Sequence, residues 1–121
     1  EFLANYRNHH SIMAKHRGMP TMIFDEIDTG VSGVVADQMG KLITSMGENM
    51  QVMAITHLPQ IASKGESHFL VTKSFNADGK AVTNISQLSE DERVNEIARM
   101  LSGEVINDAA IANAKVLLNS R

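Results

Sequence analysis

Two short apolar runs, separated by a segment with helical spacing, constrain the fold of this chain more than any other feature. The first run covers residues 21–25 (TMIFD) and the second covers residues 51–56 (QVMAIT). Strand, helix and strand in so few residues predict a βαβ unit, and hence a parallel sheet covered by helices, with the first strand buried. The helix would follow the loop at residues 30–33 and end at Gly47, and its apolar residues recur at helical spacing: Val35, Met39, Leu42, Ile43 and Met46.

The chain after residue 56 predicts a short helical turn and an antiparallel hairpin. Pro59 suits the first position of a helix, and the turn would run through Ala62 and end at Gly65. Residues 69–75 and 81–88 have the composition of strands. The residues between them, Asn76-Ala77-Asp78-Gly79, are typical of a tight turn, so the two runs should pair as a hairpin.

Two helices are predicted at the C-terminal end. Residues 89–92 (SEDE) have the capping-box pattern, so a helix should begin there and end at Ser102-Gly103. A last helix should begin at about Asn107 or Asp108. The buried faces of the two helices would be formed by Val94, Ile97, Ala98 and Leu101, and by Ile111, Ala114 and Leu118. The predicted fold class is α/β, with a parallel βαβ core followed by a β-hairpin and two C-terminal helices.

Composition excludes several functional classes. The chain has 11 Lys and Arg against 14 Asp and Glu, and this net charge of −3 argues against a dedicated nucleic-acid surface. The lack of cysteine excludes a disulfide framework and a thiolate zinc site. No apolar stretch approaches the roughly 20 residues that span a bilayer, so we expect a cytoplasmic protein without membrane contact. The chain has neither an initiator Met nor a signal pattern, so we expect it to be part of a longer protein.

Three acidic side chains, Asp25, Glu26 and Asp28, directly follow the first predicted strand. In open α/β sheets ligands bind outside the carboxyl ends of the strands, so these carboxylates lie where a site is expected if residues 28–30 bend the chain. An apolar strand that ends in Asp-Glu has the form of a Walker B element, which holds Mg²⁺ and activates water. The alternative is a solvated loop whose acidic groups favour the N-terminus of the next helix.

The second strand of the βαβ unit ends in Thr56-His57. Adjacent parallel strands would bring His57 to the same edge as Asp25 and Glu26, where its ring could donate a hydrogen bond to a phosphate oxygen. For a single His in this position, a residue that caps a helix or is merely exposed would be the preferred interpretation. The acidic strand end one βα unit earlier favours the functional interpretation.

The segments "IFDEIDTGVSG" and "ITHLPQIA" resemble the Walker B, D-loop and switch-histidine segments of the ABC-type ATPase head of the RecN family, bacterial SMC-like DNA repair proteins. The segment "ERVNEIARMLSG" extends the resemblance, which covers residues 11–121. ABC transporters usually have Asp-Glu-Pro and a Ser-Ala-Leu-Asp type D-loop, and SMC heads usually have Asp-Ala-Ala-Leu-Asp where this chain has residues 28–33. The D-loop sequence therefore favours the RecN family over both.

The resemblance implies a role for each acidic and histidine position. Asp25 would be the Walker B carboxylate that holds Mg²⁺ through water, Glu26 the general base, and His57 the sensor of the ATP γ-phosphate. The D-loop, which would meet a second head, comprises Asp28, Gly30, Ser32 and Gly33. The implied cofactors are ATP and Mg²⁺. The implied partners are a second RecN-like head, the N-terminal half of the same head and DNA, and the implied location is the bacterial nucleoid.

Residues 11–121 would thus form the C-terminal lobe of an ABC-type head that acts in DNA double-strand break repair and recombination, and residues 1–10 remain unassigned. A Walker A loop is missing, because Gly40-Lys41 has Val35 where the first glycine should be and Leu42 after the lysine. The chain alone should therefore not hydrolyse ATP. The alternatives are a transporter-type or other SMC-like ATPase subunit, and a non-catalytic interaction module.

Overall fold

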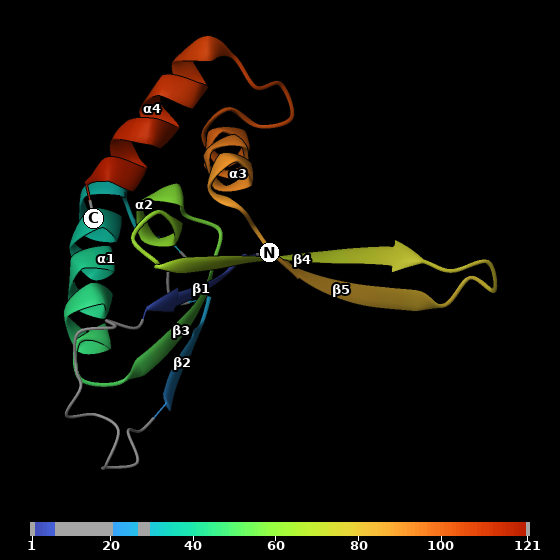
Figure 1. The fold of residues 1–121 in the computed structure, drawn as a ribbon, viewed down its shortest axis with the longest axis horizontal. Helices are drawn as coiled ribbons and strands as arrows, with labels where there is room; N and C mark the ends of the chain where they lie inside the picture. Colours follow the sequence, from blue (N-terminus) through green and yellow to red (C-terminus); the bar gives the residue numbers. More distant parts are fainter. Residues whose placement is uncertain (1, 7–20, 27–29, 121) are drawn as a thin grey trace.

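The computed structural model describes residues 2–6, 21–26 and 30–120, which form five strands and four helices. The elements are, in chain order, β1 (Phe2–Tyr6), β2 (Thr21–Asp25), α1 (Gly33–Gly47), β3 (Gln51–Thr56), α2 (Pro59–Ala62), β4 (Ser67–Phe75), β5 (Ala81–Gln87), α3 (Glu90–Ser102) and α4 (Asp108–Asn119). Figure 1 shows α1 and α2 against the sheet, with α3 and α4 packed on each other at one end. The predicted α/β fold class is confirmed.

The strands form one sheet in the order β2-β3-β1-β4-β5. β2 and β3 pair in parallel, from Thr21 opposite Gln51 to Asp25 opposite Ile55, so the predicted βαβ unit is confirmed. The other pairs are antiparallel, and β1 lies between β3 and β4. The sequence left residues 1–10 unassigned, yet the strand that joins the βαβ unit to the hairpin comes from this segment.

β2 lies at the edge of the sheet, and the prediction that this strand is buried is wrong. Met22 is 37% exposed and Ile23 is 63% exposed, while Phe24 is half-buried. Among the described residues, β2 has a strand neighbour on one side only. The apolar composition predicted the strand correctly, but it could not show which elements cover it.

The buried face of α1 consists of small residues and one isoleucine: Ala36, Gly40, Ile43 and Gly47. Of the predicted apolar residues, Ile43 is buried, but Val35 and Leu42 are 45% and 64% exposed, which corrects that part of the prediction. The reason is close packing against α2. A Cβ at Gly40 would lie 2.9 Å from Lys64 Cδ and 3.1 Å from the Gln60 carbonyl oxygen, so the helix must present its small residues there.

Two apolar clusters form the core. One joins the sheet to α1 and α2 through Ala4, Ala36, Ile43, Val52, Ala54 and Ile61. The other joins α2, α3 and α4 through Ala62, Ile97, Ala98, Ala110, Ala114 and Leu118. This second cluster confirms most of the predicted C-terminal core, with Val94 and Ile111 partly buried at its margin. Leu101 is the exception, because it is 37% exposed and does not belong to the buried face.

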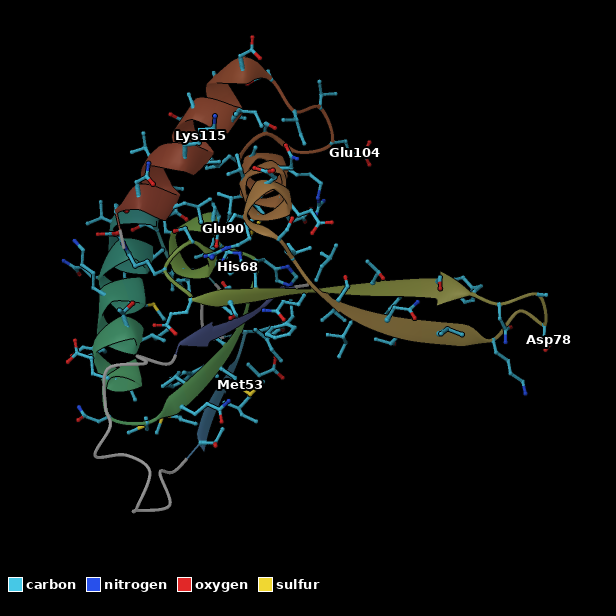
Figure 2. The ribbon with its side chains drawn as sticks, in the orientation of Figure 1. Met53, His68, Asp78, Glu90, Glu104 and Lys115 are labelled. Atoms are coloured by element: carbon cyan, nitrogen blue, oxygen red, sulfur yellow. The ribbon has the colours of Figure 1, made fainter. Side chains whose placement is uncertain are left out.

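A buried arginine on α3 fixes this helix to the turn between α2 and β4. Arg93 is 2% exposed, and its guanidinium donates hydrogen bonds to the carbonyl oxygens of Gly65 at 2.7 Å and Glu66 at 3.1 Å. It also pairs with the carboxylate of Glu90 at 2.7 Å. Figure 2 shows Glu90 and His68 close together at the base of α3. Because backbone carbonyls and a carboxylate satisfy this charge, it can be buried.

The hairpin and both helix starts follow their local sequence signals. The Asn76 side-chain oxygen accepts hydrogen bonds from the backbone of Asp78 and Lys80, and Gly79 has a φ of +73°. The Ser89 hydroxyl and the Glu92 carboxylate form the reciprocal capping box, and Asn107 caps α4. The hairpin extends from the body as a two-stranded arm, with Asp78 at its tip (Figures 1 and 2).

Candidate functional site

The carboxyl ends of β2 and β3 form one edge of the sheet, as predicted. Because the two strands are parallel and adjacent, Asp25 at the end of β2 lies opposite Ile55, just before Thr56 ends β3. The Glu26 backbone N–H donates to the Ile55 carbonyl oxygen at 3.1 Å, which extends the pairing one residue beyond β2. The chain segments that carry the acidic residues and the histidine therefore leave the sheet side by side.

The chain bends at Glu26 itself. Glu26 has a φ of +46°, the left-handed region that side chains other than glycine rarely adopt. Such a conformation costs about 1–3 kcal/mol and is often found at functional sites. The bend predicted at residues 28–30 lies largely outside the described residues, and the structure shows a turn just before it, at Glu26. β2 thus ends at the first acidic residue, Asp25, and the chain turns at the second, Glu26, which is the geometry that the Walker B interpretation requires.

Glu26 and His57 meet at this edge. The His57 Nε2 atom lies 3.6 Å from Glu26 Oε1, and the two side chains are 60% and 54% exposed. Asp25 is exposed as well. An exposed pair of this kind adds little to stability. The contact matters because it shows that the Glu26 and His57 side chains lie close together at this edge. A carboxylate and an imidazole that face each other and water can both reach a ligand at this edge.

The predicted D-loop lies partly within the described residues. Asp28 lies outside them, so its prediction stays open. Gly30 is exposed with a φ of +77°, and a Cβ there would meet no other atom within 4 Å. Ser32 is the N-cap residue of α1 and Gly33 is its first residue, although the Ser32 side chain makes no capping hydrogen bond. The described part of this segment thus starts the helix and remains accessible to a partner.

The residues at this edge suit Mg²⁺ that keeps most of its water ligands. Within the described ranges, no group of three or more His, Cys, Asp or Glu residues could hold a metal. Mg²⁺ commonly binds through one or two carboxylates together with waters and substrate phosphates. Asp25 and Glu26 supply exposed carboxylates of this kind, so they fit a metal that arrives with a nucleotide.

Thr56 is a residue of this edge to which the sequence assigned no role. It is fully buried, and its hydroxyl oxygen accepts a hydrogen bond from the Leu58 backbone N–H at 3.0 Å. His57 lies between the two residues that this bond joins.

No described helix is long and apolar enough to cross a membrane.

The parallel pair of β2 and β3, with Asp25 and Glu26 at the end of one strand and His57 after the other, agrees with the ABC- or SMC-type head that the sequence resemblance implied. This arrangement and the relatives reported next support an ABC- or SMC-type head. No protein-family model matches the chain. Individual proteins do match it, and those compared are DNA repair proteins RecN, so the chain is a RecN-like segment.

The RecN proteins come from distant bacteria. The protein of Haemophilus influenzae is 46% identical over 101 residues, which are 84% of this chain and 18% of the relative. That of Xylella fastidiosa (strain 9a5c) is 47% identical over 100 residues, 83% of this chain and 18% of the relative. That of Bacillus subtilis is 40% identical over 108 residues, 89% of this chain and 19% of the relative. The chain thus spans less than a fifth of the relatives' length.

These relatives confirm the predicted RecN resemblance. They do not favour the two alternatives, a transporter-type or other SMC-like ATPase subunit and a non-catalytic module.

Proposed function

We propose that this chain forms the C-terminal part of a RecN-type ATPase head in a longer protein. There it contributes to ATP binding and hydrolysis in DNA double-strand break repair and recombination. The observation that carries this proposal is the contact between Glu26 and His57 at the carboxyl edge of the parallel strands. A general base activates the water that attacks the γ-phosphate, and a phosphate sensor binds that same phosphate, so the two side chains must lie close together, as Glu26 and His57 do.

Each residue of the edge has a distinct proposed role. The Asp25 carboxylate would hold Mg²⁺, which would supply positive charge beside the ATP phosphates. Glu26 accepts a proton from the attacking water, and His57 donates a hydrogen bond to a γ-phosphate oxygen. Residues 28–33, with Gly30, Ser32 and Gly33 at the start of α1, meet a second head.

The chain needs partners to complete this site. Its sequence contains no Walker A loop, so the N-terminal half of the same head would supply the phosphate-binding loop. The partners are therefore that half, a second RecN-like head and DNA, and the proposed location is the nucleoid in the bacterial cytoplasm. Because phosphoryl transfer depends mainly on positioning and charge stabilisation, we expect the 121-residue chain alone to lack turnover.

The test is ATP turnover by the full-length protein, with and without linear DNA, in wild type and in Glu26→Gln. We expect the variant to bind ATP with unchanged affinity and to lose at least 100-fold in turnover, since it keeps the shape of the side chain and removes the base. Asp25→Asn should raise the Mg²⁺ concentration that half-saturates turnover. Glu48→Gln is the matched control, because Glu48 is an exposed residue at the end of α1.

Two results would contradict the proposal. If Glu26→Gln turned over ATP at the wild-type rate, Glu26 would not be the general base. If intact wild-type protein showed no turnover with or without DNA, the ATPase assignment itself would be wrong.

A further inference from the structure

A buried hydroxyl lies directly before the histidine of the proposed site. Thr56 is the last residue of β3 and has no exposed surface. A buried hydroxyl needs a hydrogen-bonding partner, and here the oxygen accepts from the Leu58 N–H at 3.0 Å. The bond spans one residue, and that residue is His57.

This bond closes a tight side-chain turn around His57. Hydroxyl residues form such turns by bonding to the backbone two residues further along the chain. The turn joins a buried residue to an exposed one: Thr56 is buried, in line with the alternation along β3, and the His57 side chain is 60% exposed. The histidine leaves the sheet at the edge where Glu26 lies, and the His57 Nε2 atom is 3.6 Å from Glu26 Oε1.

Both ends of the turn are anchored in the fold. Before it, β3 pairs with β2 and β1 in the sheet. After it, the Leu58 carbonyl oxygen accepts the Ile61 and Ala62 N–H groups at 3.1 and 3.0 Å and so begins α2. The following Pro59 is buried. The strand and the helix are fixed, and the bond between the Thr56 hydroxyl and the Leu58 N–H restricts the path of the two residues between them, His57 and Leu58.

We propose that Thr56 is a positioning residue that holds His57 at the γ-phosphate position. This inference rests on the proposed ATPase function and adds to it a residue that touches neither nucleotide nor metal. A displacement of about 1 Å at a reacting group can lower the rate about 100-fold. Loss of the Thr56 hydroxyl should thus reduce turnover by roughly 10- to 100-fold while KM for ATP changes little.

The experiment compares three variants in the full-length protein. Thr56→Ser keeps the hydroxyl and should retain turnover within about threefold of wild type. Thr56→Val keeps the branched shape and removes the acceptor. Thr56→Ala also removes the acceptor, but it places no methyl group near the Leu58 nitrogen, so it remains informative if the valine variant does not fold. Hydrogen exchange at the His57 and Leu58 amides should accelerate in the valine and alanine variants and not in the serine variant.

A double-mutant cycle with His57→Ala separates positioning from a general structural role. If Thr56 acts through His57, Thr56→Ala should not lower turnover further once His57 is alanine. An equal loss in both backgrounds, or wild-type turnover in both Thr56→Val and Thr56→Ala while His57→Ala is impaired, would overturn the inference and leave the proposed function intact. Absence of turnover in wild type would instead refute the function and this inference with it.

Discussion

Replacing Glu26 by glycine should leave the chain more stable than replacing it by alanine, although both changes remove a residue of the proposed site. Glu26 has a φ of +46°, and only glycine adopts positive φ values without a steric penalty. The side chain is 54% exposed, so its removal sacrifices little packing. The backbone strain at this bend therefore affects stability more than the packing of the Glu26 side chain does.

The magnitude follows from two opposing terms. A left-handed conformation costs a residue with a side chain about 1–2 kcal/mol. Glycine loses more backbone entropy on folding, by roughly 0.5–1 kcal/mol relative to alanine. The net gain for Glu26→Gly relative to Glu26→Ala then lies between about 0 and 1.5 kcal/mol, with a central value of about 0.75 kcal/mol. Alanine is the matched reference because both variants lose the contact with His57, and only glycine relieves the backbone.

The measurement is urea denaturation of the 121-residue chain, in which a change of midpoint at constant m-value reports the change in stability. We expect the order Glu26→Gly above Glu26→Ala. If the alanine variant were as stable as the glycine variant or more stable, the bend at Glu26 would carry no strain. The same Glu26→Gly change should abolish ATP turnover in the full-length protein, so that stability and activity move in opposite directions.

Two further predictions concern the contact between α1 and α2. Gly40→Ala should lower the unfolding free energy by about 1–2 kcal/mol, because the new Cβ would lie 3.1 Å from the Gln60 carbonyl oxygen. Thermal unfolding would measure this loss. Gly33→Ala is the control, since a Cβ at Gly33 has no contact shorter than 3.8 Å and should leave stability nearly unchanged. Hydrogen bonds from Lys41 and then Lys64 hold the pKa of the Asp37 carboxyl below its usual value of 3.8. This stabilisation is complete above pH 3.8 and is lost as pH falls through the lower folded pKa. The difference in unfolding midpoint between wild type and Asp37→Asn should therefore shrink below about pH 4; a difference that stayed constant from pH 6 to pH 2 would contradict the assignment.

Local signals in the sequence predicted the hairpin and the helix starts correctly. The Asn76 side chain bonds to the backbone of its own turn, and Ser89 and Glu92 cap the first turn of α3. In each case the interacting groups lie within four residues of one another, so the pattern of residue types contains the whole interaction. Elements of this kind can be predicted without knowledge of the rest of the fold.

Interactions between distant segments were not predictable in the same way. Arg93 is buried because carbonyl oxygens 27 and 28 residues earlier in the chain accept its hydrogen bonds. Similarly, β1 is a strand because β3 and β4 pair with its two sides. Neither segment shows in its own residues which groups will lie beside it, and a charged helical residue is exposed in most proteins.

The candidate site was partly predictable from the sequence. Parallel strands bring their carboxyl ends to one edge, so the approach of His57 to Glu26 was predictable once both strands were recognised. The bend at Glu26 and the Thr56 turn were not, because a φ value and a single side-chain hydrogen bond depend on the detailed path of the chain. The sequence therefore predicted that Glu26 and His57 lie close together. The structure added the backbone bend and the Thr56 hydrogen bond beside them.

β2 shows that apolar composition predicts an element better than it predicts what surrounds that element. Met22 and Ile23 are exposed, and within the described part of the chain only β3 pairs with this strand. Proteins normally cover an apolar edge strand, since its unpaired backbone groups and apolar side chains favour association. The proposed N-terminal half of the head would provide such a cover, and a strand that paired with β2 in parallel would bring its own carboxyl end to the edge that carries Asp25. The same exposed strand would then join the two halves of the head and align the two halves of the ATP site.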